Sequence, residues 1–259
     1  MRADAFLSQN GYVESRTRAA RLISEGKVII DGKVVRKASE EILDGEHAVQ
    51  ITAVDTYVGR GGLKLEHALK YFEIDVTDKK CIDVGASTGG FTDCLLQNGA
   101  SVVYAVDSGR DQLHRKLLDD IRVVNIEGYN ARELSRDEFG VFQIAVMDVS
   151  FISQTLIHNA VSDILENGAM FISLIKPQFE SGRSALGKNG IVKDAKDREN
   201  AISRVLESAV LNNLEPIGIV NSPIEGGDGN KEYLACFQKK EGNTSNYISS
   251  EHIKAISRK

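Results

Sequence analysis

Two charged residues stand at the ends of apolar segments, where an enzyme would place groups for acid–base chemistry. Asp148 follows the apolar run Gln143–Met147, and Lys176 follows the run Ala169–Ile175. In an open α/β sheet, ligands sit at the carboxyl ends of the strands, so both side chains should face one crevice. A lysine beside a carboxylate in such a crevice can take part in proton transfer. The alternative for each residue is a solvent-exposed charge that only ends a strand.

A second candidate is the glycine loop in the segment 81–91, Cys-Ile-Asp-Val-Gly-Ala-Ser-Thr-Gly-Gly-Phe. Ser87 stands where a dinucleotide loop needs its second glycine, which argues against NAD. An acidic strand end beside a glycine bend suits S-adenosylmethionine, whose tail carries an ammonium group. Asp107 ends the next strand, where an acid can accept hydrogen bonds from both ribose hydroxyls. The alternative is a tight turn that binds no ligand. The predicted cofactor-binding residues are Asp83, Gly85, Ser87, Gly89, Gly90, Phe91, Asp107 and Asp148.

Two other motifs fit less well. The segment 85–89 also matches G-x-S-x-G, the nucleophile elbow of hydrolases, but none of His114, His158 and His252 lies where a catalytic triad would need it. The segment 182–189 nearly spells a Walker loop, but Asn189 replaces the serine or threonine that binds magnesium. We expect a mobile basic loop beside the active site instead.

Composition excludes several classes of protein. The chain has 259 residues, of which 42% are hydrophobic and 27% charged, a globular balance compatible with one or two domains. Its longest apolar run is far shorter than the roughly 18 residues of a membrane-spanning helix, and no signal-peptide core follows the N-terminus. We therefore expect a cytoplasmic protein without a membrane partner. Cys81, Cys94 and Cys236 are widely spaced and the five histidines are scattered, so we expect free thiols and no metal.

The predicted elements alternate between strands and helices. Strands are predicted at 80–84, 101–106, 122–126, 143–147, 169–175, 215–221 and 232–237. Helices are predicted at 63–72, 89–98, 153–166 and 194–212. This alternation predicts a parallel sheet covered on both faces, with the last two strands paired antiparallel because no helix joins them. Residues 55–62 read as a glycine-rich linker in which 56–58 could pair as a brief strand, and 241–259 as a polar tail or a final short helix.

The N-terminal segment has its own pattern. Residues 1–37 carry eight lysines and arginines against four acidic residues, in a chain whose net charge is −5. A basic arm on an acidic body is expected of a phosphate-binding surface, although a solvated helix face would look similar. Ser15 is a plausible N-cap for a helix over 16–24, which follows a short helix over 5–9 and precedes a hairpin over 27–36.

Two helices followed by a hairpin resemble the RNA-binding module first seen in ribosomal protein S-four. The matching residues are Gly11, Ser15, Arg16, Ala19, Gly26, Lys27, Val28, Asp31, Gly32, Lys37, Asp44 and Gly45. The resemblance implies a small α+β RNA-binding domain over residues 1–54. The predicted RNA-binding residues are Arg2, Arg16, Arg18, Arg21, Lys27 and Lys37, together with Arg60 from the glycine-rich segment.

The order Lys64, Asp148, Lys176, Glu232 resembles the Lys-Asp-Lys-Glu tetrad of the FtsJ-type ribose methyltransferases. The segments 59–65, 83–91, 148–153, 176–180 and 229–233 resemble the TlyA-type rRNA methyltransferases, a group also called hemolysins, and the match runs to about residue 239. The resemblance implies an α/β fold, a Rossmann-like class I methyltransferase domain over 63–240. It also implies methyl transfer from S-adenosylmethionine to a ribose 2′-hydroxyl, that of a cytidine, in the rRNA of ribosomal subunits.

These residues make chemical sense of that reaction. A ribose hydroxyl is a poor nucleophile at neutral pH, so a base must remove its proton as the methyl group arrives. A lysine can serve only when neutral; burial lowers the pKa of a lysine, and nearby carboxylates raise it. We expect Lys176 to be the base, Asp148 to orient it, and Lys64 with Glu232 to position the ribose.

Two other functions stay open at this stage. One is a pore-forming or membrane-acting hemolysin, which the lack of a spanning segment or a long amphipathic helix disfavours. The other is a non-enzymatic RNA-binding protein, which the intact set of four charged residues disfavours.

Overall fold

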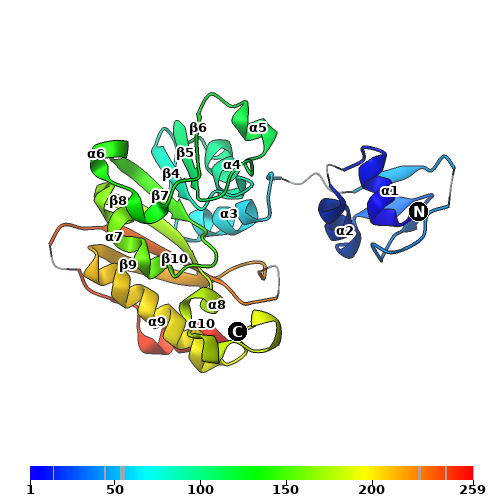
Figure 1. Ribbon diagram of the computed structural model, residues 1–259. Coiled ribbons are helices and arrows are strands. Elements are labelled where there is room, and N and C mark those ends of the chain that lie inside the picture. The colour runs from blue at the N-terminus through cyan, green and yellow to red at the C-terminus, as the bar shows by residue number, and fades with distance from the viewer. Residues whose placement is uncertain (14, 44, 53–55, 227–228, 243, 259) are drawn as a thin grey trace. The chain divides into compact units, whose positions relative to one another are not determined.

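The computed structural model describes residues 1–13, 15–43, 45–52, 56–226, 229–242 and 244–258 (Figure 1). Contacts divide the chain into two compact units, residues 1–55 and 56–259. Each unit has an apolar core of its own. Asp44 of the N-terminal motif and Asp55, the first residue of the predicted linker, lie outside the described residues.

The larger unit is built on a seven-stranded sheet with the order β6-β5-β4-β7-β8-β10-β9 (Figure 1). Its strands are β4 (Lys80–Val84), β5 (Val102–Asp107), β6 (Val123–Glu127), β7 (Phe142–Met147), β8 (Leu165–Ile175), β9 (Leu214–Asn221) and β10 (Tyr233–Lys239). Strands β4 to β8 pair in parallel, and β10 lies antiparallel between β8 and β9. The predicted parallel sheet and its antiparallel terminal pair are therefore confirmed. The strand order reverses between β4 and β7, which makes their carboxyl ends the expected ligand site.

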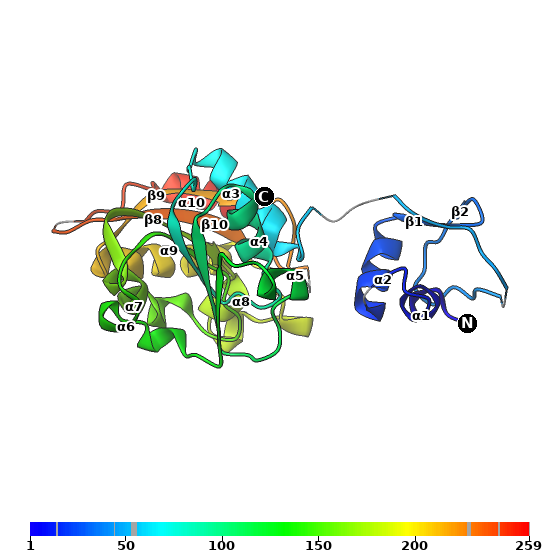
Figure 2. The ribbon, with the colours of Figure 1, turned by 90° about the horizontal axis from the view of Figure 1, so that it is seen from above.

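Helices cover both faces of this sheet (Figures 1 and 2). They are α3 (Gly61–Tyr71), α4 (Gly90–Gln97), α5 (Arg115–Leu118), α6 (Arg136–Phe139), α7 (His158–Asp163), α8 (Pro177–Glu180), α9 (Ala195–Leu211) and α10 (Ser250–Arg258). Short 3-10 turns are η1 (Ala131–Glu133), η2 (Gln154–Leu156), η3 (Arg183–Ala185) and η4 (Lys188–Gly190). Because side chains alternate along a strand, neighbours in β4 join different cores. Cys81 belongs to the cluster with Leu65 of α3, whereas Ile82 belongs to the cluster with Val205 of α9.

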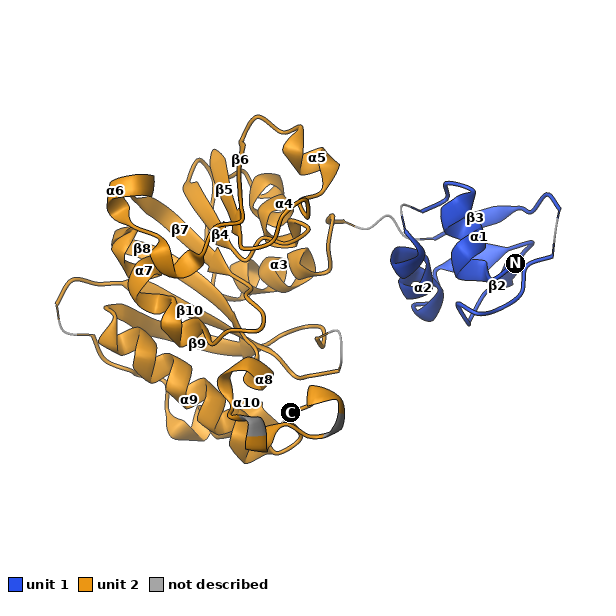
Figure 3. Ribbon diagram, viewed as in Figure 1, with its two compact units in different colours: residues 1–55 blue, residues 56–259 orange. Residues whose placement is uncertain are grey.

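The smaller unit packs two helices on a three-stranded sheet (Figure 3). Its elements are α1 (Ala3–Gln9), α2 (Arg16–Ser24), β1 (Val28–Ile30), β2 (Lys33–Val34) and β3 (Val49–Ile51), in the sheet order β2-β1-β3. The predicted cap is confirmed, because the Ser15 hydroxyl accepts a hydrogen bond from the Arg18 backbone N–H at 3.2 Å. The predicted hairpin turns at Asp31 and Gly32, both with positive φ, as a tight two-residue turn requires. Strand β3 was not predicted, because three residues are too few to show an alternation.

The structure corrects two expectations about the larger unit. Gly61 and Gly62 begin helix α3 instead of ending a linker, and residues 56–58 form no strand. The helix predicted over 153–166 is only η2 and α7, because β8 already begins at Leu165, which pairs with β7. Of the two alternatives for residues 241–259, the final short helix is the one present: it is α10, whose Ile253 and Ile256 are buried in the core.

Candidate active site

Three adjoining pockets open at the carboxyl ends of the parallel strands. The β4–β5 pocket, of about 430 Å³, is lined by residues that include Ser87, Asp107 and Asp148. The glycine-loop pocket, of about 190 Å³, shares Ser87 and Asp148 with it and adds Phe91 and Lys176. The Lys176 pocket, of about 320 Å³, also contains Glu232, Phe179 and the η4 residues Asn189 and Gly190. Shared lining residues make the three pockets one continuous site.

The predicted glycines are required by close approaches of the backbone. Gly85 has φ +85°, and a Cβ there would lie 2.7 Å from the backbone oxygen of Asp148. Gly89 has φ +92°, and its Cβ would lie 2.1 Å from Leu117 Cδ1. A Cβ on Gly90 would lie 3.0 Å from the backbone nitrogen of Gly62. The loop after β4 is therefore pressed between the end of β7, α5 and the start of α3.

The segment 56–62, predicted as a linker, is instead docked on helix α4. The Val58 backbone N–H donates to Asp93 Oδ2 at 2.8 Å, and Gln97 Nε2 donates to the Thr56 backbone oxygen at 2.8 Å. Tyr57 is buried in the same core as α3 and α4. These contacts fix the first turn of α3, and with it Lys64, against the glycine loop.

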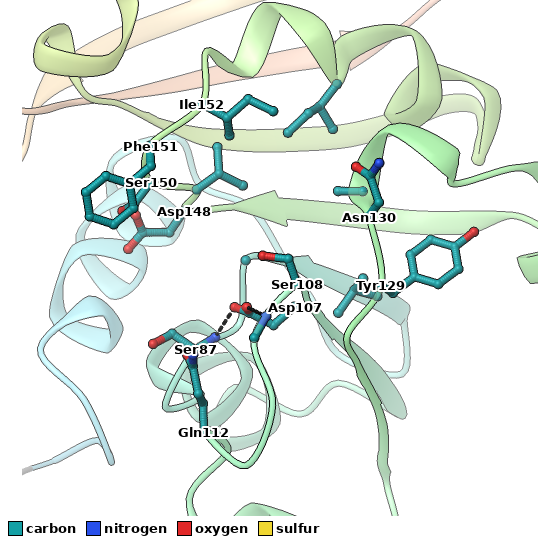
Figure 4. A pocket seen from close by; sticks show the side chains of 16 residues that line it. Ser87, Asp107, Ser108, Gln112, Tyr129, Asn130, Asp148, Ser150, Phe151 and Ile152 are labelled. Atoms are coloured by element: carbon teal, nitrogen blue, oxygen red, sulfur yellow. Dashed lines mark hydrogen bonds between the residues drawn. The ribbon is translucent and has the colours of Figure 1, made fainter.

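Two acidic residues at neighbouring strand ends have different surroundings. Asp107 lies in the β4–β5 pocket, where Oδ2 accepts from the Ser87 N–H at 2.8 Å and Oδ1 from the Gly109 N–H at 2.7 Å (Figure 4). Asp83 is fully buried and lines none of the three pockets. Its Oδ2 accepts from Thr92 Oγ1 at 2.7 Å, whereas Oδ1 has no hydrogen-bond partner among the described residues. Burial raises the pKa of Asp83 to about 7.

This buried acid predicts a pH-dependent stability. A pKa of about 7 in the folded state, above the ordinary 3.8, means that the native protein binds a proton more tightly than the unfolded chain. The stabilisation is complete below about pH 4 and is lost as the pH rises through about 7. We therefore expect Asp83→Asn, measured by urea unfolding without ligand, to gain on the order of 1–4 kcal/mol relative to the parent between pH 4 and pH 8.

The exposed Asp137→Asn serves as the control for this experiment and should change the free energy of unfolding equally at both pH values. A parallel pH dependence of Asp83→Asn and the parent protein would contradict the assignment.

The four tetrad residues form two ion pairs. Lys176 Nζ lies 2.6 Å from Asp148 Oδ1 and donates to Ser150 Oγ at 2.8 Å. Lys64 Nζ lies 2.5 Å from Glu232 Oε2, with only 9% and 3% of the two side chains exposed. Lys176 and Glu232 line the same pocket, so each pair contributes one residue to it, whereas Lys64 is buried behind Glu232 and lines none of the three pockets. Removing one partner of such a pair strongly destabilises the folded protein, since the other charge is left buried without compensation.

Several pocket residues were not predicted from the sequence. Ser150 accepts from Lys176, and Phe151 is 92% exposed with φ +65° and its ring centroid 5.2 Å from that of Phe179. Figure 4 shows Asp148 and Phe151 on one side of the β4–β5 pocket and Asn130 on the other. Asp107 ends β5, and Asn130 comes shortly after the end of the neighbouring strand β6; that position was the signal the sequence offered.

The predicted RNA-binding residues fall into two sets. Those up to residue 37 lie in the smaller unit, where Asp4 accepts hydrogen bonds from Arg2 and Arg16, at 3.0 and 3.1 Å, and Lys27 pairs with Glu25 at 2.6 Å. Arg60 lies in the larger unit, where Nη2 donates to the Glu225 backbone oxygen at 2.6 Å. Its guanidinium therefore ties the start of α3 to the loop before β10.

Among the residues that the structure describes, no cluster of three or more histidines, cysteines and acidic residues could hold a metal ion. Within the same residues, no helix combines the length and the apolar character needed to span a membrane.

Comparisons with known proteins agree with this geometry. The family model described as FtsJ-like methyltransferase matches residues 57–239, and the S4 domain model matches residues 1–47. "Hemolysin A" of Brachyspira hyodysenteriae is 41% identical, over 92% of this chain and 99% of its own length. The "16S/23S rRNA (cytidine-2'-O)-methyltransferase TlyA" of Mycobacterium tuberculosis is 39% identical, over 90% of this chain and 88% of its own. A solved structure from Streptococcus thermophilus, 41% identical, covers 100% of this chain and 94% of that chain with a TM-score of 0.80.

The predicted fold class is thereby confirmed: an α/β, Rossmann-like methyltransferase unit with a small N-terminal RNA-binding module. The sequence match, the strand order and the tetrad geometry lead to one conclusion: this chain belongs to the FtsJ-like methyltransferase family and begins with an S4 domain.

Proposed function

We propose that this protein transfers a methyl group from S-adenosylmethionine to the 2′-hydroxyl of a cytidine ribose in ribosomal RNA, acting on ribosomal subunits in the cytoplasm. The observation that carries the proposal is the pair of lysine–carboxylate contacts beside the glycine-loop pocket, Lys176–Asp148 and Lys64–Glu232. Relatives named for rRNA cytidine-2′-O-methylation support the substrate class. A tritium-transfer assay from S-adenosylmethionine to purified ribosomal subunits tests it, with liposome leakage measured in parallel because one relative is named a hemolysin.

The residues around the glycine loop fit S-adenosylmethionine. The ligand is cationic, and Asp83, Asp107 and Asp148 stand at or near the ends of β4, β5 and β7. Burial raises the pKa of Asp83 to about 7, so this carboxyl carries only part of a negative charge below the loop at neutral pH. In this proposal Asp107 receives the ribose hydroxyls, and the amino-acid tail lies in the glycine-loop pocket, which Gly85 and Gly90 line. When bound, the cofactor supplies the methyl group from its sulfonium.

Lys176 is the base in the proposed mechanism. It takes the proton of the ribose hydroxyl as the O–CH₃ bond forms and the S–CH₃ bond breaks, so it must first release its own proton. Asp148 and Ser150 hold Nζ at the boundary between the glycine-loop pocket and the Lys176 pocket. Lys64 and Glu232 position the ribose in the Lys176 pocket. Holding both partners in line supplies much of the remaining rate enhancement.

The S4 domain supplies RNA affinity in the proposed function. Residues 1–54 would act as the RNA-binding domain, and residues 63–240 as the methyltransferase domain, with Lys37, Arg2 before α1 and the arginines of α2 near phosphates. Lysine and arginine contacts to phosphates provide affinity that depends on salt more than on sequence. The hydrogen bond from Arg60 to the Glu225 backbone oxygen gives Arg60 a structural role in addition to the RNA contact proposed for it.

Asp107 provides a direct test of the cofactor site. Replacing it with alanine removes two carboxylate oxygens that anchor the Ser87 and Gly109 amides and would accept the ribose hydroxyls. We expect the dissociation constant of S-adenosylmethionine to rise about 10–100-fold, as two lost hydrogen bonds imply. Isothermal titration calorimetry measures this change, with Asp137→Ala as the exposed control. Unchanged affinity in Asp107→Ala would remove Asp107 from the cofactor site.

A further inference from the structure

Glu180 is a buried carboxylate that takes no part in the tetrad. It is the last residue of α8 and is 3% exposed. Its Oε2 accepts a hydrogen bond from Ser153 Oγ at 2.5 Å, and Oε1 accepts from the Gln154 backbone N–H at 2.9 Å. Both carboxylate oxygens are therefore bonded to the chain that follows β7.

These contacts join the two segments that carry one of the ion pairs. Helix α8 follows Lys176 directly, and the Phe179 N–H donates to the Lys176 backbone oxygen at 2.9 Å. Ser153 and Gln154 end the loop that begins at Asp148 and carries Ser150. The start of that loop is held by the Asp148 N–H, which donates to the Val84 backbone oxygen at 3.0 Å. Glu180 holds the other end.

Neighbouring buried groups strengthen the same connection. Gln154 is 1% exposed, its Nε2 donates to the Leu174 backbone oxygen at 3.3 Å, and its Oε1 accepts from Ser173 Oγ at 2.7 Å. Arg204 Nη1 of α9 donates to the Glu180 backbone oxygen at 2.8 Å. The loop after β7 is thus fixed by polar groups of β8 and α8, close to the end of the strand that delivers Lys176.

A carboxylate is an expensive side chain to bury, because it leaves water and must find hydrogen-bond donors inside the protein. Burial raises the pKa of Glu180, while the hydrogen bonds from Ser153 and Gln154 oppose that rise. An apolar residue would fill the space at lower cost but could not hold the hydroxyl and the amide. The geometry therefore gives this side chain a task beyond filling the core.

We propose that Glu180 is a positioning residue for methyl transfer: by clamping Ser153 and Gln154 it sets the place of Asp148 and Ser150 against Lys176. The inference rests on the proposed function, because it assigns Glu180 to the step in which Lys176 acts. Displacing a catalytic group by about 1 Å can cost on the order of 100-fold in rate. Loss of the clamp should therefore reduce kcat much more than it changes KM for RNA.

The experiment compares Glu180→Ala, Glu180→Gln and the exposed control Glu207→Ala on helix α9. We expect Glu180→Ala to lower kcat by about 10–100-fold with KM for RNA within about threefold of the parent. Glu180→Gln keeps the shape and an acceptor for the Gln154 N–H, so it should retain kcat within about threefold. Ser153→Ala removes one clamp contact from the other side and should lower kcat in the same direction, which covers the case that Glu180→Ala does not fold.

Three outcomes would overturn the proposal. The first is a parent-like kcat in Glu180→Ala. The second, if Glu180→Ala does not fold, is a parent-like kcat in Ser153→Ala. The third is a Glu180→Gln variant as slow as Glu180→Ala, which would indicate a role for charge and not for position. Hydrogen–deuterium exchange of the peptide 148–156 separates this inference from the proposed function. If the parent protein transfers no methyl group, the function fails, and the clamp is still tested: exchange should rise in Glu180→Ala and stay near the parent level in Glu180→Gln.

Discussion

Lys176→Ala should lower kcat for methyl transfer by a factor on the order of 10²–10⁴, the usual contribution of a general base. The Lys176 ammonium contacts Asp148 at 2.6 Å and lines both pockets that meet at the reaction centre. Its removal leaves Asp148 and Ser150 without a base between them. The affinity for S-adenosylmethionine should stay within about threefold, because Asp107 and the glycines are untouched. Single-turnover kinetics and calorimetry measure the two quantities.

Lys176→Arg distinguishes a base from a positive charge. Arginine keeps the charge but cannot be deprotonated in a protein, so the variant should be as slow as Lys176→Ala. Lys70→Ala, whose side chain is 73% exposed on α3, is the matched control and should retain the parent rate. Full activity in Lys176→Arg would assign the residue an electrostatic role, and full activity in Lys176→Ala would remove it from the mechanism.

Removing residues 1–55 should weaken binding to ribosomal RNA and flatten its dependence on salt. If the S4 domain makes about four phosphate contacts, the slope of log K against log salt should decrease by about 3–4, and affinity at low salt should fall about 10–100-fold or more. Filter binding of labelled rRNA across a salt series measures both effects.

The remaining chain provides its own control in this experiment. Residues 56–259 contain two apolar clusters of their own, and the residues that line the cofactor pockets all belong to this unit. Affinity for S-adenosylmethionine should therefore be retained. An unchanged salt slope would show that the S4 domain does not supply the phosphate contacts, and substitution of Lys27 and Lys37 by glutamine in the full chain should reproduce part of the loss.

Local signals made much of the fold predictable. Strands β4 and β7 are short apolar runs; β4 ends with Asp83-Val84, and Asp148 directly follows β7. The ends of both strands could therefore be predicted from the local sequence alone. The same holds for α2, where Ser15 caps the first turn and Gly26 follows the last one. Asp148 and Lys176 could be placed together because parallel strands bring their carboxyl ends to one edge of the sheet. Lys64 and Glu232 were joined to them only by the resemblance to the FtsJ-type ribose methyltransferases.

Contacts between segments that are distant in the sequence could not be predicted from local patterns. The glycines at 59–62 lack periodicity and look like a linker, but Gly59 and Gly62 are required by close contacts with Thr88 and Tyr57. The charge of Arg60 indicates RNA, whereas its hydrogen bond is to Glu225, 165 residues away in the sequence.

Glu180 and helix α10 show the same limit. The local sequence does not indicate that Glu180 is buried. Its burial follows from its contacts with the loop after β7. The sequence left a loose tail and a final short helix open for this segment, and the burial of Ile253 and Ile256, which decides for the helix, depends on α9 and β9. The burial of these residues is determined by tertiary packing, which neither the composition nor the hydrophobic periodicity of the local sequence indicates.

The most direct test of the account is mass-spectrometric mapping of ribosomal RNA after incubation of ribosomal subunits with this protein and S-adenosylmethionine carrying a CD₃ methyl group. The account predicts CD₃ on the ribose 2′-oxygen of a cytidine, present with the parent protein and missing with Lys176→Ala. Label on a base, or no label in the RNA of either subunit, would contradict it.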